Sequence, residues 1–554
     1  MTRATPRPAA DGTRARPPAV RDVRPAASAA VGAATALALA LGALAPPPPD
    51  AADAAARTWA SIPLYQEGVA AGPGGTFAVV PAGSSPAYLP GSRVLAVPSP
   101  AVVTGPGGAG TAHGAAPASV ARTAPAGGSA ALAARSRGWV AAGDPPGSGT
   151  RFADLGLDAL LDLRTLAADD GAVVAGPSPF WRYVWPRDAA FAAVALARTG
   201  HPDDAVRVLS FLQSVQGADG TFEARYLPDG SGVPDDRPGQ SDGPGWAMWA
   251  VGALLAHLHD DARDAALARL SGLVTRSTDR LLAEVDTPDG LPRASSDYWE
   301  LPAGELTLGT AAPILAGLEA SARVAHVRAD PREADAATGA ARLRTAVEET
   351  FGPAGYPRTV GGSATGTPSG RPSGTVARDA ATAFLLPPFQ PAALTGAERA
   401  WRSSVPAMLR PAGGLAPGGS WRADGVSWTP QTALYALAAA STGDQVQAEH
   451  WLDWLDAHRT ATGALPEKVL ADGSPAAVAP LAWTSALVVL ALAELDARRP
   501  GQEMSSMRIT DTAARSEGTS SVSSIPSTRA ASSAAALSSS VRYQTADASS
   551  DPPS

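Results

Sequence analysis

Glu300 is the acid that the sequence places best for chemistry. It ends the stretch Asp289-Gly-Leu-Pro-Arg-Ala-Ser-Ser-Asp-Tyr-Trp-Glu300, directly after two aromatic residues. The glycine and proline near the start of this stretch break helices, so we expect a loop. A carboxylic acid that is partly desolvated by aromatic rings holds its proton closer to neutrality, as a general acid must. A solvated loop glutamate beside two rim aromatics is the alternative.

A second acid, Glu467, lies in the segment Gly463-Ala-Leu-Pro-Glu-Lys-Val469. Because it follows a proline, we expect an extended or turn conformation, from which its side chain can project into a cavity. The alternative is a salt bridge to the neighbouring Lys468, the single lysine of the chain.

The segment Phe180-Trp-Arg-Tyr-Val-Trp-Pro-Arg-Asp188 combines Arg187 and Asp188 with several aromatic residues, Trp185 among them. An arginine beside an aspartate can hold sugar hydroxyls by charge-assisted hydrogen bonds, while aromatic rings stack on the sugar. Alternatively, Asp188 caps the helix that follows and pairs with Arg187. The two roles are compatible.

Helices must position these residues, because apolar residues recur at three- and four-residue spacing through the middle of the chain. This spacing predicts twelve helices, at residues 153–169, 188–199, 203–216, 244–259, 263–284, 308–328, 332–351, 377–386, 396–410, 429–442, 444–458 and 481–498. Asp188 can cap the second helix, Gly200 can end it, and Pro202 suits the first turn of the third.

The connections between these helices alternate between short and long. Every even-numbered helix follows a long connection, at 170–187, 217–243, 285–307, 352–376, 411–428 and 459–480. Long loops inside a compact domain are uncommon unless they are functional. Helices 244–259 and 481–498 carry few charges and should be buried, whereas 263–284 and 332–351 should lie outside. We therefore predict an all-α (α/α)6 barrel with all long loops at one end; a generic bundle or a solenoid is the alternative.

The flanking regions differ from this core. Arginines in residues 1–24 precede an apolar run, 26–45, which is typical of an export signal or a membrane anchor. A disordered tail is the alternative for residues 1–49. Residues 50–149 suggest a small β-rich or irregular region, with strand-like runs at 76–80 and 93–97, before the barrel at 150–499. Residues 500–554 are rich in Ser, Ala and Thr, and we expect disorder there.

Composition limits the possible partners. The 44 basic and 52 acidic residues give a net charge of −8, which argues against a nucleic-acid or anionic-membrane partner. A membrane contact is expected only through the possible N-terminal anchor. The chain has no cysteine, and its seven histidines show no metal-ligand spacing, so we expect neither a metal nor another cofactor.

If the long loops share one face, Gln240, Asp242 and Trp483 join the candidates for substrate binding. The set Trp185-Pro-Arg-Asp188, Gln240-Ser-Asp-Gly243, Trp299-Glu300, Pro466-Glu467 and Pro480-Leu-Ala-Trp483 resembles glycoside hydrolase family 15, the glucoamylase family, over residues 150–498. The resemblance implies an (α/α)6 barrel, with Glu300 as general acid and Glu467 as general base. It also implies that Arg187 and Asp188 bind the terminal sugar, with Trp299 close by, and that the reaction inverts the anomeric centre.

Three departures from the family pattern bear on the substrate. Leu301 stands where relatives often have a second acid, and Asp235-Asp-Arg-Pro-Gly239 where they tend to have a tryptophan. The fifth long loop reads Gly413-Gly-Leu-Ala-Pro-Gly-Gly-Ser-Trp-Arg422 and leads to Trp428-Thr-Pro-Gln431. These positions help to build the neighbouring sugar site, so they put starch-like substrates in question.

The leading hypothesis is an exported or anchored, exo-acting glycoside hydrolase for a glucose-containing α-linked glycan or disaccharide. A carbohydrate-binding barrel without catalysis is the second hypothesis, because of Leu301 and the altered fifth loop. A terpenoid-cyclase-like or lipid-modifying barrel is the third, but the pair Asp235-Asp236 is too little of the acid-rich motif that it needs.

Overall fold

The computed structural model describes residues 59–97, 103–104, 126–360 and 377–499. Residues from Ala60 onward form one compact unit. The predicted export segment at 26–45 and the tail at 500–554 lie outside the described residues. Within the described part, no helix has the length and apolarity needed to cross a membrane.

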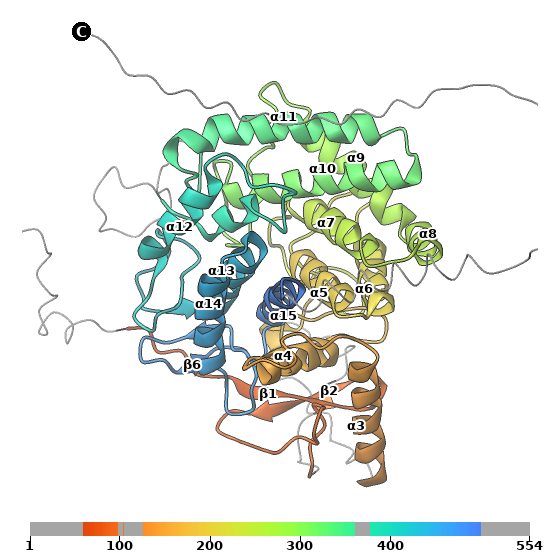
Figure 1. Cartoon of the computed structure of the whole chain (residues 1–554), viewed down its shortest axis with the longest axis vertical. Coiled ribbons are helices and arrows are strands. Elements are labelled where there is room, and N and C mark those ends of the chain that lie inside the picture. The colour runs from red at the N-terminus through yellow and green to blue at the C-terminus, as the bar shows by residue number, and fades with distance from the viewer. Residues whose placement is uncertain (1–58, 98–102, 105–125, 361–376, 500–554) are drawn as a thin grey trace, which may run out of the picture. The chain divides into compact units, whose positions relative to one another are not determined.

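Six elements form an inner ring (Figure 1), in which each packs on the next and the last packs on the first. They are α5 (Pro186–Arg198), α7 (Gly243–Leu255), α10 (Leu308–Arg328), the 3-10 helix η4 (Ala380–Leu385), α13 (Thr429–Thr442) and α15 (Ala482–Ala497). Almost every residue of α5, α7 and α15 is buried, as their low charge content predicts.

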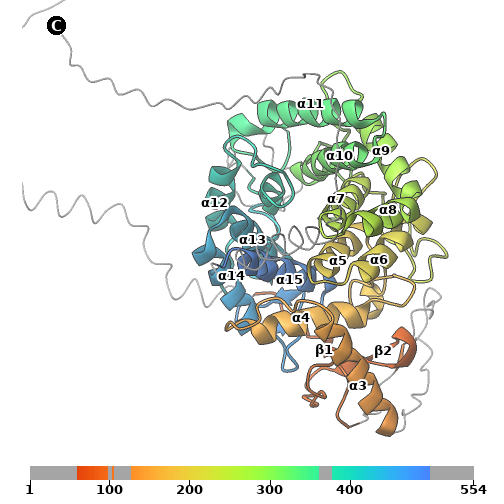
Figure 2. The ribbon, with the colours of Figure 1, turned by 45° about the vertical axis from the view of Figure 1, so that its right-hand side comes forward.

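Outer helices cover this ring (Figure 2) and pack against its members. They are α4 (Ala153–Leu166), α6 (Pro202–Val215), α8 (Asp260–Arg269), α9 (Ser271–Val285), α11 (Glu333–Phe351), α12 (Ala397–Met408) and α14 (Gln445–Ala457). Six pairs of an outer and an inner element make the predicted (α/α)6 barrel.

Aromatic side chains fill the centre of the ring. Phe191 of α5 lies 5.1 Å, between ring centroids, from Trp246 of α7, which lies 4.8 Å from Phe384 of η4. All three are buried. Tilted and edge-on packing of this kind is favourable beyond the area that it buries. The barrel is therefore a packed core and not a pore.

Backbones also approach closely inside the ring. A Cβ atom added to Gly245 of α7 would lie 2.3 Å from the carbonyl oxygen of Pro313, and one added to Gly317 would lie 2.5 Å from the Cα of Gly245. Only glycine fits such a contact. The glycines explain how α7 and α10 can pack so tightly in the inner ring.

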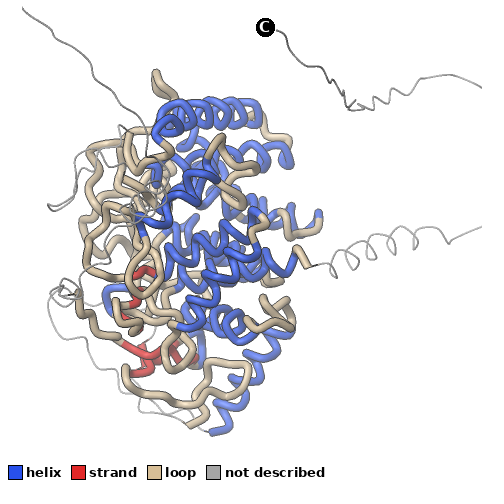
Figure 3. The backbone as a smooth tube through the Cα atoms, turned by 60° about the vertical axis from the view of Figure 1, so that its left-hand side comes forward, coloured by secondary structure: helices blue, strands red, loops and turns tan. Residues whose placement is uncertain are grey.

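The described parts of the six long connections lie at one face of the barrel (Figure 3). Each leads into an inner element, as the alternation of loop lengths predicts. Gly200 ends α5 with a φ of +80°, and Pro202 begins α6, both as expected. The predicted cap of α5 is wrong, because the helix begins at Pro186 and no side chain caps it. Asp188 instead lies inside the first turn and faces Arg187.

Two predicted helices differ from the structure. Residues 263–284 are not one helix but parts of α8 and α9, which are separated at the fully buried Leu270. Gly272, two residues after Leu270, is the only helix-breaking residue near that point in the sequence. Residues 377–386 contain only the six-residue η4, because Asp379 caps it by accepting from the N–H of Ala381 and Pro387-Pro388 prevents its extension.

The region before the barrel is partly β and partly helical. Strands β1 (Gln66–Ala71), β2 (Phe77–Pro81) and β3 (Val103–Thr104) form an antiparallel sheet in that order, and η1 (Pro73–Gly75) joins the first two. The run at 93–97 makes only an isolated bridge at Leu95. The helix α3 (Ala126–Ala141) was not expected; its alanine content favours helix over the irregular structure predicted there.

A second small sheet lies among the loops. It joins β4 (Ser427–Trp428), β5 (Lys468–Val469) and β6 (Pro475–Ala476) in that order. Two further 3-10 turns, η2 (Pro179–Trp181) and η3 (Gly352–Ala354), belong to loops as well.

Candidate active site

A cavity of about 330 Å³ opens among the long loops. Aromatic and charged side chains line it together, which is the usual make-up of a site for a small polar ligand. The lining residues are Ala175, Phe180, Trp181, Trp185, Arg187, Asp188, Arg225, Arg237, Tyr298, Trp299, Glu300, Pro417, Trp421, Trp428, Pro430, Gln431, Glu467, Leu481 and Trp483. Seven of the nine predicted site residues are among them.

Glu300 reaches the cavity from the loop before α10. Its backbone has a φ of +56°, which is rare for a residue with a side chain, and its N–H donates to the carbonyl of Asp297 at 2.7 Å. The indole N–H of Trp185 donates to Oε1 at 2.7 Å, and the guanidinium of Arg237 binds Oε2. The sequence suggested purely aromatic surroundings for the Glu300 carboxylate. The structure differs, because the Arg237 guanidinium contacts one of its oxygens.

Glu467 reaches the same cavity from the loop before α15. The indole N–H of Trp181 donates to Oε1 at 3.3 Å, and Nζ of Lys468 lies 3.1 Å from Oε2. Its backbone is held on both sides, because its N–H donates to Val478 and its carbonyl accepts from Thr429. The expected projection into a cavity and the alternative salt bridge to Lys468 thus occur together.

The two glutamates have matching partners. Each carboxylate receives one indole N–H on one oxygen and one cation on the other. The helices that follow their loops, α10 and α15, are the third and sixth members of the inner ring and thus opposite ones. Two carboxylates that line one cavity can act as an acid and a base on the same substrate.

Arg187 and Asp188 line the same cavity as the two glutamates. Nη2 of Arg187 lies 3.0 Å from Oδ2 of Asp188, and its guanidinium carbon lies 4.5 Å from the ring centroid of Trp483. Nε and Nη1 of Arg187 are buried without a hydrogen-bond partner among the described residues, and Oδ2 of Asp188 has only its ion pair with Arg187. Such atoms are costly unless a ligand satisfies them, so this pair is suited to bind hydroxyl groups.

Burial raises the pKa of Asp188 to about 6, and Arg187 opposes that rise. The neighbouring Glu300 carboxylate adds to it. A ligand hydroxyl that donates to Asp188 would favour the charged carboxylate.

Gln240 and Asp242 do not line the cavity. Both are buried, and the backbone of Gln240 forms a β-bridge with Ser296. Ser296 belongs to the loop before α10 that carries Glu300, which we call the acid loop. Oδ2 of Asp242 accepts from the indole N–H of Trp246 at 3.0 Å. Burial raises the pKa of Asp242 to about 6, and Arg187 lowers it again. These two residues therefore support the site and do not face a ligand in it.

A buried ion network holds the acid loop. Arg358 donates to Asp297 and to Asp379, at 2.8 Å each, and lies 3.7 Å from the ring centroid of Trp299. The hydroxyl of Tyr298 donates to Asp379. Burial raises the pKa of the Asp379 carboxyl, and Arg358 counteracts it. The residues just before Glu300 are thus fixed from the loop before η4.

Several lining residues were not predicted as site residues. Trp181, Arg225 and Arg237 contact the carboxylates or the rings beside them, and Trp421 and Trp428 extend the aromatic wall, 5.5 Å apart. One signal was available, since Trp181, Trp421 and Trp428 all stand in predicted long connections. Arg237 was mentioned only as part of a departure from the family pattern, and nothing in its spacing pointed to Glu300.

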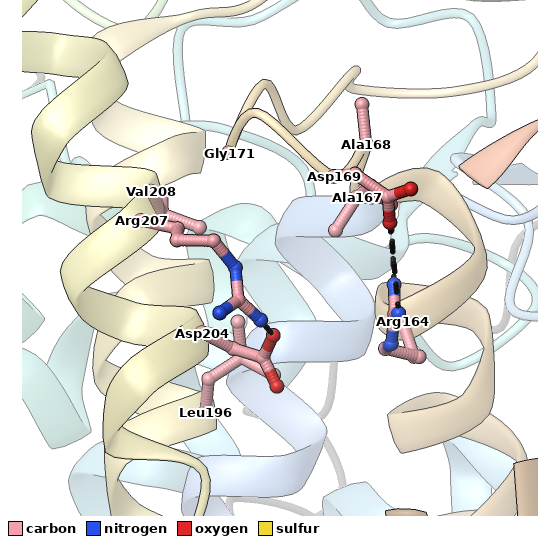
Figure 4. Close-up of a pocket in the computed structure, with 9 residues that line it drawn as sticks. All are labelled: Arg164, Ala167, Ala168, Asp169, Gly171, Leu196, Asp204, Arg207 and Val208. Atoms are coloured by element: carbon pink, nitrogen blue, oxygen red, sulfur yellow. Dashed lines mark hydrogen bonds and ion pairs between the residues drawn. The ribbon is translucent and has the colours of Figure 1, made fainter. Parts of the chain in front are cut away.

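A second cavity, of about 10 Å³, lies between α4 and α6 (Figure 4). It has room for about one water molecule. Arg207 pairs there with Asp204, and Arg164 lies 3.9 Å from Asp169. Its size excludes it as a sugar site. Across the described ranges, no group of three or more His, Asp or Glu residues could hold a metal ion.

The fold is that of known glycosidases. A solved wild-type glycosidase aligns with a TM-score of 0.50 at 24% identity, over 62% of this chain and 96% of its own. A bacterial glucoamylase in complex with acarbose aligns with a TM-score of 0.52 at 15% identity, over 67% and 59%. The family 15 glucoamylase of Hypocrea jecorina gives 0.51 at 15% identity, over 62% and 70%. These likenesses confirm the predicted (α/α)6 barrel.

No protein-family model matches this sequence. One curated relative, described as an uncharacterized glycosyl hydrolase of Methanocaldococcus jannaschii, is 34% identical over 95 residues. The matched part is 17% of this chain and 15% of that relative. The comparisons thus show the fold, an (α/α)6 barrel, and two glutamates line one cavity in it.

Proposed function

We propose that the protein is a glycoside hydrolase that releases a terminal glucose unit from an α-linked glycan or disaccharide. The observation that carries the proposal is the pair of glutamates in one cavity, with an indole N–H and a cation on each. The names of the structural relatives support the substrate class, since one is a glucoamylase in complex with acarbose and another a glycosidase in complex with glucose.

In this mechanism Glu300 donates a proton to the glycosidic oxygen as the bond to the anomeric carbon breaks. Glu467 removes a proton from a water molecule, whose oxygen attacks that carbon from the opposite face. The leaving group departs as an alcohol, and the product is a hemiacetal of inverted configuration.

The closed centre of the barrel supports action at chain ends. Tyr298 and Trp483 line the cavity and pack on Phe384 and Phe191 of the aromatic core, with centroids 6.0 and 5.9 Å apart. A glycan can therefore not pass through the ring. Arg187 and Asp188, with their unsatisfied buried atoms, would bind the hydroxyls of the terminal sugar.

The test is a substrate panel with the purified protein. Residues 50–500 are incubated with maltose, isomaltose, trehalose, dextran and starch, and released glucose is measured. We expect turnover of at least one of them. Measurable sugar affinity without any turnover would instead indicate a carbohydrate-binding barrel, which the ion pair between Arg237 and Glu300 and the departure at Leu301 would then explain.

We propose export as well, on the basis of the arginine-rich residues 1–24 and the apolar run 26–45. Fusing residues 1–49 to a reporter and fractionating the cells tests this. Retention of the reporter in the cytoplasm would contradict it.

A further inference from the structure

Four cations at or beside the cavity each lie within ion-pair distance of a different carboxylate. The pairs are Arg187 with Asp188, Lys468 with Glu467, Arg225 with Asp235, and Arg237 with Glu300. All of these residues line the cavity except Lys468 and Asp235. The formal charges of the eight residues cancel.

The proposed reaction removes one of these pairs. A general acid must be protonated before it acts, and a neutral carboxyl no longer attracts a guanidinium strongly. When Glu300 carries the proton, Arg237 keeps only a contact between its Nε and Oδ2 of Asp235, at 3.3 Å. Asp235 is already shared with Arg225. Arg237 is then the one cation of this set without a carboxylate of its own.

Arg237 is also the most exposed cation of the set. Its side chain is 40% exposed, against 16% for Lys468 and 6% each for Arg187 and Arg225. The other three are fixed by aromatic rings: Lys468 by Trp428, Arg187 by Trp483 and Arg225 by Tyr183. No ring contact of this kind holds Arg237 among the described residues. Among these four cations, Arg237 can therefore exchange its ion-pair partner at the lowest cost in free energy.

The position of Arg237 limits what its new partner can be. It binds the oxygen of Glu300 that Trp185 does not, at the edge of the cavity beside the acid. In the proposed reaction the glycosidic oxygen must reach the Glu300 carboxyl to be protonated. The leaving group would therefore occupy the space next to Oε2 of Glu300, which is the oxygen that Arg237 binds. A guanidinium presents a planar fork of donors, which suits two neighbouring hydroxyls.

We propose that Arg237 exchanges Glu300 for the leaving-group sugar when substrate binds, and so selects leaving groups that offer paired oxygen acceptors. The inference rests on the proposed function, because it needs Glu300 as the general acid. The exchange frees the acid at the moment when the leaving group arrives. Arg237 is thus a specificity-determining residue that touches the leaving group and not the terminal sugar.

Calorimetric binding in the Glu300→Gln background provides the first test, since this variant imitates the neutral acid and turns over little substrate. Adding Arg237→Ala should weaken binding of the best disaccharide from the panel about tenfold or more, because charge-assisted hydrogen bonds are lost. Binding of glucose, which fills only the terminal-sugar position, should be unchanged. Arg293→Ala is the matched control, since Arg293 is an exposed arginine of the acid loop that does not line the cavity.

Kinetics in the Glu300 background provide the second test. Arg237→Ala should lower kcat/KM for the disaccharide about tenfold or more beyond any change in kcat/KM for α-glucosyl fluoride, whose leaving group is a single atom. Equal losses on both substrates, or no loss on either, would overturn the inference and leave the proposed function intact. A parent that turns over neither substrate would overturn both.

Discussion

Glu300 and Glu467 have the same kinds of partner but need opposite charge states during the proposed reaction. Glu467 is paired with Lys468, whose side chain is 16% exposed, whereas Glu300 is paired with Arg237, whose side chain is 40% exposed. We therefore expect the two proposed roles to depend on how firmly each cation is held.

Replacing either glutamate by glutamine tests these roles. Glu300→Gln and Glu467→Gln should each leave the melting temperature almost unchanged and lower kcat by ~10²–10⁴, since each removes a proton transfer. Glu398→Gln, an exposed change on the outer helix α12, is the control and should retain full activity. Near-parental activity in either loop variant would rule out that assignment.

Asp242 makes a prediction about pH. Burial raises its pKa to about 6, whereas an aspartate in the unfolded chain titrates near 3.9. Between these values the folded state binds more protons, so stability falls as pH rises through the window and stays low above it. Asp242→Asn cannot ionise and should be more stable than the parent by about 1–3 kcal/mol at pH 7.

The advantage of Asp242→Asn should vanish near pH 3, where both forms are neutral. Urea unfolding at the two pH values measures this, with the exposed Asp264→Asn as control. A variant that is less stable than the parent at pH 7 would show that the charge of Asp242 stabilises the fold through Arg187.

At the scale of elements, the acid loop depends on a distant loop. Arg358 precedes η4, yet it joins Asp297 of the acid loop to Asp379. Arg358→Ala leaves both buried carboxylates without their cation and should lower the unfolding free energy by about 3–5 kcal/mol. Urea unfolding at pH 7 checks this. Replacing all three residues together, as Asp297→Asn, Arg358→Met and Asp379→Asn, should recover part of that loss.

The sequence predicted the elements well wherever periodicity and loop length agreed. Inner helices such as α7 and α15 stood out because they carry almost no charge, and the long loops marked one end of the barrel. Prediction failed where tertiary contacts decide: the helical pattern is interrupted at the buried Leu270, where the nearby Gly272 is too weak a signal to end a helix. At η4 the carboxylate of Asp379 and two prolines limit the helix to six residues.

The candidate site was predictable in part. Residues in recognisable motifs, such as Trp185 and Glu467, do line the cavity. Gln240 and Asp242 also belong to such a motif, but they are buried and do not line the cavity. Spacing along the chain does not show which side of a loop faces a ligand, so this could not be predicted. Arg237 could not be assigned from sequence, since its partner lies 63 residues away.

At the scale of the whole molecule, the inner ring of helices predicts the anomeric configuration of the released sugar. Inner helices α10 and α15 are opposite members, so the two carboxyl groups should lie about 6.5–9.5 Å apart and leave room for a water molecule. An α-linked substrate should then release β-glucose first. Proton NMR of the anomeric signal during the first minutes decides this. Initial α-glucose would require one glutamate to act as a nucleophile.

The C-terminal region gives a prediction from composition alone. Residues 501–554 contain few large apolar residues, so they cannot bury enough surface to offset the loss of chain entropy. Removing them should change neither the melting temperature nor kcat. A clear drop in either quantity in the truncated protein would show that this region contributes to the barrel.

The aromatic core that closes the ring has a consequence for how ligands enter and leave the cavity. Phe191, Trp246 and Phe384 close the centre of the ring, so a ligand cannot pass through it. If the proposed reaction occurs, we expect the terminal sugar to lie deeper than the leaving group and to depart after it. We then expect accumulated glucose to compete with the next chain end.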